Sequence, residues 1–179
     1  LRAGFEADAL TVAQFAGLSA LLDGSGVELV PLRGTVEKLR EVKDDGEIAL
    51  IEQACRIADK AWATLIESDA IAPGRTEREV ARDLEWEMYA RGAAAIAFET
   101  IVAAGPHSAV PHHRPTSDGL AAGDFVKIDF GAVVDGYHSD MTRTVAVGDV
   151  GPQRLRMLEV VLASQSAGVE AVAAGVAAS

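Results

Sequence analysis

The sequence predicts an α+β fold in which helices pack on an antiparallel sheet, preceded by the end of a small α/β domain. Three observations support this prediction. Residues 125–147 alternate apolar and polar side chains around an Asp-Gly dipeptide, which is typical of a β-hairpin. Two stretches, 44–65 and 76–91, repeat apolar residues at helical spacing. Residues 1–41 alternate short strand and helix patterns, as in an α/β layer.

The N-terminal segment contains two strand patterns, each followed by a helix pattern. These four elements cover residues 2–7, 11–22, 27–32 and 35–42. Because alternating elements of this kind form α/β layers, we expect residues 1–42 to be the end of one domain and residues 43–179 to belong to another.

Two long helices are predicted next. The first begins near residue 44, and its apolar stripe consists of Ile48, Ile51, Cys55, Ala58, Trp62 and Leu65. The second begins at Thr76, where Glu79 completes a capping box, and it ends before Gly92. We interpret the charged residues between 75 and 87 as a solvated helix face without a function.

The composition narrows the class of protein. With 49% hydrophobic and 24% charged residues the chain is an ordinary globular protein, and its net charge of −11 argues against nucleic acid and anionic membranes as partners. The single cysteine, Cys55, excludes an internal disulfide and fits a reducing compartment, and we expect it to be buried. No run of about 18 apolar residues occurs. We therefore expect a cytoplasmic protein.

Three of the four histidines lie in a predicted loop, residues 105–117, directly after a predicted strand at 98–104. Pro111 and Pro115 restrict the backbone of this loop, which holds His112 and His113 in place at a smaller entropic cost. A histidine in a polar loop is usually a surface residue. The position of the loop just before the hairpin favours a functional role for one of the two.

The hairpin brings two aspartates together. If Asp135 and Gly136 form a two-residue turn, Asp129 lies opposite Thr142, and Asp140 falls on the same face as Asp129. Diagonal neighbours of this kind are roughly 7–8 Å apart at the backbone. Two carboxylates without a basic partner on a half-buried face are costly unless a divalent cation balances them, although a solvated hairpin face is the simpler alternative.

At this point the sequence resembles a known family. The segments IDFGA and GYHSDMTRT, together with the upstream FETIVAAGPHSAVPHHRPT, are similar to the pita-bread metallopeptidases, specifically the Xaa-Pro dipeptidases and Xaa-Pro aminopeptidases. The resemblance extends from about Val42 to the C-terminus. It implies a partial pita-bread fold, in which residues 1–42 are the remnant of an N-terminal domain and residues 43–179 the N-terminal half of a catalytic domain.

The resemblance also implies roles for individual residues. Asp129 and Asp140 would be metal ligands, and His112 would be the catalytic histidine that follows a proline in this family. The resembled enzymes hold two divalent ions with five protein ligands, of which only the two aspartates are present here. Mn²⁺ or Co²⁺ suits mixed carboxylate and imidazole ligands, with Zn²⁺ or Fe²⁺ as alternatives. Thr142, His138 and His113 are expected around the ligands or at the pocket.

The implied activity is metal-dependent hydrolysis of the peptide bond that precedes proline, with proline-containing peptides as partners and a homodimer as the assembly. We expect the chain by itself to be inactive, since the remaining ligands are missing. The alternatives are a non-catalytic pita-bread module that binds peptides and a metal-free, creatinase-like hydrolase. Both typically lose the aspartates, so the presence of Asp129 and Asp140 favours the peptidase.

Overall fold

The structure is a computed structural model that describes residues 1–177. The chain forms two compact units, Leu1–Gly46 and Glu47–Ser179, which are described separately.

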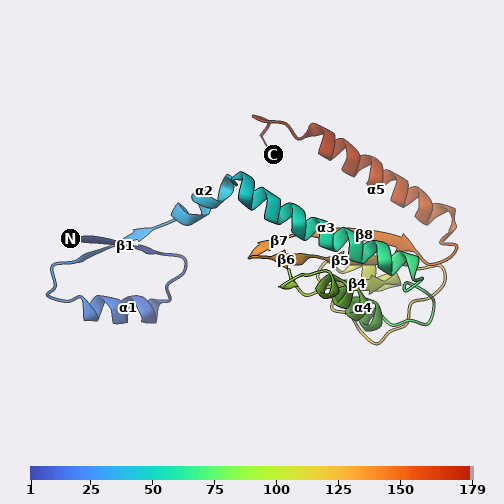
Figure 1. The fold of residues 1–179 in the computed structure, drawn as a ribbon, viewed down its shortest axis with the longest axis horizontal. Coiled ribbons are helices and arrows are strands. Elements are labelled where there is room, and N and C mark those ends of the chain that lie inside the picture. The colour runs from blue at the N-terminus through green and yellow to red at the C-terminus, as the bar shows by residue number, and fades with distance from the viewer. Residues whose placement is uncertain (178–179) are drawn as a thin grey trace. The chain divides into compact units, whose positions relative to one another are not determined.

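The first unit has the predicted order of strand, helix, strand, helix (Figure 1). Its elements are β1 (Arg2–Glu6), α1 (Val12–Leu21), β2 (Glu28–Leu32) and α2 (Thr35–Glu41). The two strands pair in parallel, which a crossover helix such as α1 permits. Thr11 and Gln14 form a capping box at the start of α1, and the ring of Phe15 lies 5.1 Å from that of Phe5 on β1. The α/β pattern read from residues 1–41 is therefore confirmed.

The second unit packs helices on two small antiparallel sheets. Its helices are α3 (Asp45–Glu67), α4 (Glu77–Ala90) and α5 (Gly151–Ala171), with the short 3₁₀ helix η1 (Gly105–Ala109). Its strands are β3 (Ala95–Ile96), β4 (Ile101–Ala104), β5 (Phe125–Phe130), β6 (Ala132–Val134), β7 (Tyr137–His138) and β8 (Met141–Ala146). The strand orders are β4-β5-β8 and β3-β6-β7, and every neighbouring pair is antiparallel.

The hairpin has the predicted turn and register. Asp135 and Gly136 have φ angles of 47° and 83°, as a type I′ turn requires, and Asp129 pairs with Thr142. The ladder divides at Gly131, which explains why β5 and β6 belong to different sheets. A Cβ atom on Gly131 would lie 1.9 Å from the carbonyl oxygen of Ser139, so only glycine fits at this crossing.

The strand predicted at 98–104 is shorter than expected, because a bulge interrupts it. Ile96 pairs with Ala132 and Ile101 with Asp129, so the chain between β3 and β4 carries two residues more than the chain it faces. Bulges of this kind redirect side chains and are frequent beside active sites. Here the extra length places Phe98 at the wall of a pocket.

The core of the second unit lies between the helices and the sheets. Trp62 of α3 stacks on Phe130 of β5 with the ring centroids 5.8 Å apart. The buried residues of α3 are Ala54, Ile57, Ala58, Ala61 and Leu65.

The predicted stripe of α3 is partly wrong. It correctly contains Ala58 and Leu65, but Ile48 and Cys55 are exposed rather than buried. The prediction fails because the side of α3 that contacts the hairpin consists largely of alanines instead of large apolar residues. Ala54 lets the helix approach the hairpin so closely that the Ser139 hydroxyl donates to its carbonyl oxygen at 3.3 Å. A pattern weighted toward large apolar residues overlooks such positions.

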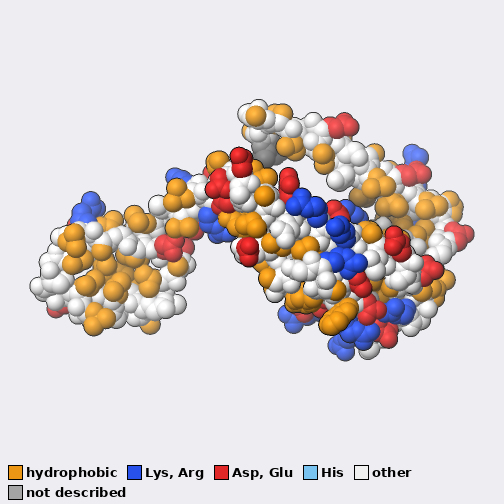
Figure 2. Space-filling model, viewed as in Figure 1, with side chains coloured by type: hydrophobic (Ala, Val, Ile, Leu, Met, Phe, Trp, Pro, Cys, Tyr) orange, Lys and Arg blue, Asp and Glu red, His pale blue; other side chains and the backbone are white. Residues whose placement is uncertain are grey.

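The last helix, α5, begins with Pro152 in its first turn. None of its described residues is buried, and the apolar side chains of Leu155 and Leu162 are exposed. Figure 2 shows hydrophobic side chains at the surface of this helix. None of the helices within residues 1–177 combines the length and the apolar character that crossing a membrane requires.

Candidate functional site

A pocket of about 330 Å³ opens beside the central strand β5. It collects residues from the bulge, the histidine loop and the hairpin, which are distant in sequence. Its lining residues are Phe98, Glu99, Ile101, His112, His113, Arg114, Asp129 and Asp140. The structure therefore brings both predicted metal ligands and the predicted catalytic histidine to one place.

The two aspartates reach the pocket from opposite strands of the hairpin. Asp129 is half-buried on β5, where it pairs with Ile101 on one side and Thr142 on the other. Thr142 lies beside a proposed ligand, as expected, and its hydroxyl donates to Asp129 Oδ1 at 2.7 Å. Asp140 is exposed just before β8. Among the described residues, the hydrogen bond that reaches these two aspartates is the one from Thr142 to Asp129.

The donor set fits a divalent cation. A carboxylate offers about four lone-pair sites, and the single bond from Thr142 leaves most of those on the aspartates available. The guanidinium at the pocket, that of Arg114, forms an ion pair with Glu99 at 3.0 Å instead of pairing with an aspartate. Oxygen ligands that are close together and not paired with a base are those that hard divalent ions prefer.

The two adjacent histidines of the loop differ in their surroundings. His112 is exposed and lines the pocket. The His113 side chain is only 10% exposed, and its Nε2 lies 2.8 Å from Oε2 of Glu77. The catalytic role of His112 stays a prediction. His138 is exposed on β7 and is not among the described residues that line the pocket.

Glu77 is the one charged residue that is fully buried among the described residues. The sequence predicted no function for it. It is the first residue of α4 and has no exposed surface. The expectation that the charged residues from 75 to 87 form a solvated face is therefore wrong at this position. Other members of that run, such as Arg82, do face solvent.

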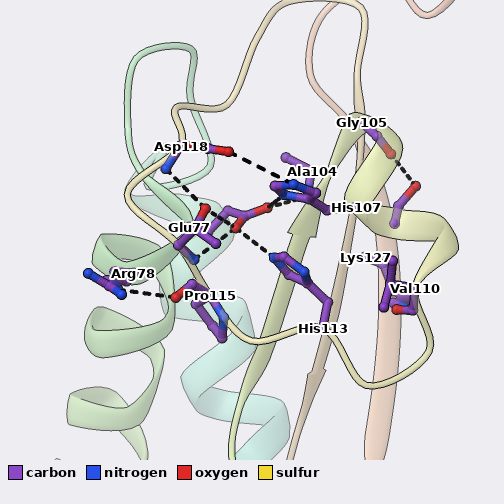
Figure 3. Close-up of polar contacts among 12 residues, drawn as sticks. Glu77, Arg78, Ala104, Gly105, His107, Val110, His113, Pro115, Asp118 and Lys127 are labelled. Atoms are coloured by element: carbon purple, nitrogen blue, oxygen red, sulfur yellow. Dashed lines mark hydrogen bonds and ion pairs between the residues drawn. The ribbon is translucent and has the colours of Figure 1, made fainter.

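Glu77 accepts hydrogen bonds on both carboxylate oxygens (Figure 3). Oε1 receives the backbone N–H of Ala104 at 2.8 Å and lies 2.9 Å from Nδ1 of His107. Oε2 receives the backbone N–H and the hydroxyl of Thr116 at 2.9 and 2.8 Å, in addition to the contact with His113. The two histidine rings stack on each other with centroids 4.2 Å apart.

These contacts set the protonation of the cluster. Burial by itself raises the pKa of Glu77, but the hydrogen bonds from Ala104, His113, Thr116 and His107 outweigh it and lower the pKa to about 2. The hydrogen bond to Glu77 raises the pKa of His107. The carboxylate is therefore ionised at neutral pH, when it can only accept.

Glu77 could have been found from helical periodicity. It lies on the same face as Val80, Ala81, Leu84 and Met88, all of which are buried, because it precedes them by whole turns of the helix. The interpretation of all charged residues from 75 to 87 as one exposed face overlooks the position of Glu77 on the buried face. An acidic residue at the head of an apolar stripe is a signal that its carboxylate enters the interior and needs donors there.

The ligand atoms of Glu77, His107 and His113 lie within 4.8 Å of one another, close enough for a metal ion to be considered there as well. All of them already take part in hydrogen bonds. The structure thus contains two groups of acidic and histidine residues: Asp129, Asp140 and His112 at the pocket, and Glu77, His107 and His113 held together by hydrogen bonds.

Comparison with known proteins shows the family. The model of metallopeptidase family M24 matches residues 49–179, and that of the creatinase/prolidase N-terminal domain matches residues 1–42. The chain belongs to the M24 metallopeptidases. The resemblance read from the hairpin and the histidine segment is confirmed, and with it the partial pita-bread fold. As a metallopeptidase family, M24 acts with divalent metals.

Individual relatives agree with this assignment. The peptidase YqhT of Bacillus subtilis is 40% identical over 174 residues, which are 97% of this chain and 48% of YqhT. The Xaa-Pro dipeptidase of Pyrococcus furiosus is 41% identical over 151 residues, 84% of this chain and 43% of that protein. Among solved structures, an Xaa-Pro dipeptidase from Bacillus anthracis superimposes with a TM-score of 0.92 at 40% identity, over 97% of this chain and 47% of that one. The chain spans about half the length of these relatives.

Proposed function

We propose that this chain contributes to the metal-dependent hydrolysis of the peptide bond that precedes proline, as part of an Xaa-Pro dipeptidase or aminopeptidase. The observation that carries the proposal is the pocket shared by Asp129, Asp140 and His112. It is supported by relatives that are named Xaa-Pro dipeptidases and align with 84% and 97% of this chain.

In this proposal Asp129 and Asp140 are ligands of two divalent ions, with Mn²⁺ or Co²⁺ preferred and Zn²⁺ or Fe²⁺ possible. Such ions, when bound, lower the pKa of a water and polarise a carbonyl group. Thr142 orients the Asp129 carboxylate through its hydrogen bond, as partners of metal ligands commonly do. His112 donates a hydrogen bond to the substrate or to the tetrahedral intermediate.

The carboxylates of the pocket support the proposal that the activity belongs to a longer protein. Among the described residues they are those of Asp129, Asp140 and Glu99, and Glu99 is paired with Arg114, which leaves fewer free carboxylates than two ions need. We propose that residues 1–42 are the end of an N-terminal domain and residues 43–179 the N-terminal half of a catalytic domain, since the chain spans about half of its relatives. Proline-containing peptides, a homodimer and a cytoplasmic location complete the proposal.

Calorimetric titration with Mn²⁺ tests the ligand assignment. We expect residues 1–179 to bind the ion weakly, because two carboxylates leave the rest of the coordination sphere to water. Asp129→Asn and Asp140→Asn should each abolish this binding. Asp59→Asn, which changes an exposed aspartate of α3 away from the pocket, should leave it unchanged. Binding that survives both pocket substitutions would contradict the assignment.

An assay on a dipeptide that ends in proline tests the reaction. We expect no turnover by residues 1–179 and turnover by the chain extended along its reading frame to the length of its relatives. Turnover by residues 1–179 that Asp129→Asn abolishes would show that the site needs fewer ligands than proposed.

A further inference from the structure

The loop that carries His112 is tied to the body of the protein by two charged side chains. Glu77 of α4 contacts it at His107, His113 and Thr116 (Figure 3). Lys127 of β5 donates to the carbonyl oxygens of Val110 and Pro111 at 2.7 and 3.4 Å. His112 lies between these anchored positions.

We propose that Glu77 is a positioning residue: its buried carboxylate holds the loop from His107 to Thr116 so that His112 faces the aspartate pocket. The proposal rests on the proposed function, because it gives His112 its task. Glu77 itself does not line the pocket and acts only through the loop.

The chemistry of the contacts requires a carboxylate at this position. Five donors converge on Glu77: two backbone N–H groups, one hydroxyl and two imidazole nitrogens. An ionised carboxylate accepts at both oxygens and donates at neither. A glutamine of the same shape would turn an NH₂ group toward at least two of these donors. The contacts also fix the ring protons, on Nδ1 of His107 and on Nε2 of His113.

The positions of the contacts explain the effect on His112. His107 and Thr116 lie near the two ends of the loop, and one carboxylate binds both, so the loop is closed at its base. His113 is bound as well, which fixes the backbone directly after His112. A closed, tied loop has fewer conformations to lose when His112 takes up its place.

Lys127 fixes the other side of His112. It binds the carbonyl groups of the two preceding residues, and it lies on β5 two positions before Asp129. The strand that carries a proposed metal ligand therefore also aligns the histidine loop. Glu77 and Lys127 together hold the peptide on both sides of His112.

The same contacts argue against a metal ion at the Glu77 cluster. An ion there would have to displace the ring protons of His107 and His113 and compete with two backbone N–H groups for the carboxylate oxygens. These oxygens have about four lone-pair sites for five donors, so no site is left for an ion.

Proton NMR of the histidine rings, with Mn²⁺ as a paramagnetic probe, tests the proposal. In the wild-type chain, Mn²⁺ in the pocket should broaden the ring signals of His112 most strongly. Glu77→Gln should remove this preference for His112 and should also remove the ring N–H signals of His107 and His113. Glu79→Gln is the matched control, since Glu79 lies in the same helical turn but caps Thr76 and is not bonded to the loop.

A milder variant keeps the test valid if Glu77→Gln does not fold. Thr116→Val removes one hydroxyl donor from Oε2 and leaves the carboxylate in place, so it should reduce the preferential broadening of His112 without abolishing it. Unchanged broadening of His112 in a folded Glu77→Gln protein would overturn the proposal.

Two further outcomes are separable. If Mn²⁺ broadens no histidine signal in the wild type, the proposed function fails. The ring N–H signals of His107 and His113 still report on the hydrogen bonds to Glu77. If these signals persist in Glu77→Gln, the positioning role of Glu77 is overturned, whatever the result with Mn²⁺. Titration with Zn²⁺ alone should leave these N–H signals intact. Their loss on addition of Zn²⁺ would identify the cluster as a cation site and overturn the positioning role.

Discussion

Two carboxylate sites adjoin the histidine loop and differ in how many hydrogen bonds their oxygens accept. Glu77 is fully buried and is surrounded by five donors. Asp129 and Asp140 open on a pocket and receive one hydrogen bond, from Thr142, among the described residues. A carboxylate whose acceptors are filled supports structure, whereas one whose acceptors are free can bind an ion or a substrate. The contrast predicts opposite responses to substitution.

The largest effect is expected for stability at Glu77. Glu77→Ala leaves its donors without an acceptor in the interior, and removal of one partner from a buried charged pair costs about 3–5 kcal/mol. The free energy of unfolding, measured with urea, should fall by about that amount. Glu79→Ala removes only a partly exposed carboxylate that accepts from the N-cap residue Thr76, and it should cost much less. If both variants lose the same free energy of unfolding, Glu77 is not the structural carboxylate described here.

Asp129 and Asp140 should behave in the opposite way. Asp129→Asn and Asp140→Asn should remove Mn²⁺ binding but change the free energy of unfolding by less than about 1 kcal/mol, because neither carboxylate is fully buried and the hydrogen bond from Thr142 to Asp129 is exposed. Each substitution also removes one of two neighbouring negative charges, which relieves their repulsion and offsets part of any loss of stability. A loss of stability comparable to that of Glu77→Ala would show that these aspartates are structural.

The acid side of the pH profile sharpens the contrast. The pKa of Glu77 is about 2 in the folded protein and 4.5 ordinarily, so its contribution to stability is complete above pH 4.5 and is lost as the pH falls toward 2. A shift of this size corresponds to at most about 3 kcal/mol. The difference in unfolding free energy between the wild type and Glu77→Gln should therefore be larger at pH 6 than at pH 3. A difference independent of pH would contradict this assignment.

His107 acts at the other end of the pH range. The hydrogen bond to Glu77 raises the pKa of His107 above its ordinary value of 6.5. The contribution of His107 to the stability of the fold is therefore complete below pH 6.5 and is lost as the pH rises through the pKa of the folded protein. An NMR titration of the His107 ring should give a pKa above 6.5 in the wild type and a lower one in Glu77→Gln. The same pKa in both proteins would remove Glu77 as the cause.

The sequence predicted the elements whose causes are local. The Asp135-Gly136 turn determines the hairpin register, and the register places Asp129 beside Asp140. The misjudged positions depend on contacts between distant segments. The burial of Glu77 is stabilised by Thr116, which is 39 residues away, and the close approach of Ala54 depends on Ser139, 85 residues away. Both partners lie outside the stretch of sequence over which helical periodicity is evaluated, so periodicity does not predict these contacts.

The smallest effect is expected at Thr142. Thr142→Val removes its hydrogen bond to Asp129 and should weaken Mn²⁺ binding by about tenfold, as is usual for groups that orient a metal ligand. Thr144→Val, on the same strand and also exposed, should leave the affinity unchanged. Both are followed by calorimetry. Equal affinities for the two variants would mean that Asp129 does not need its hydrogen bond.

The position of bound Mn²⁺ tests the contrast between the two sites most directly. It can be measured as anomalous difference density in a crystal of this chain grown with Mn²⁺. We predict density between the carboxylates of Asp129 and Asp140 and none beside Glu77. Density within the Glu77, His107 and His113 cluster, with the aspartate pocket empty, would contradict the account.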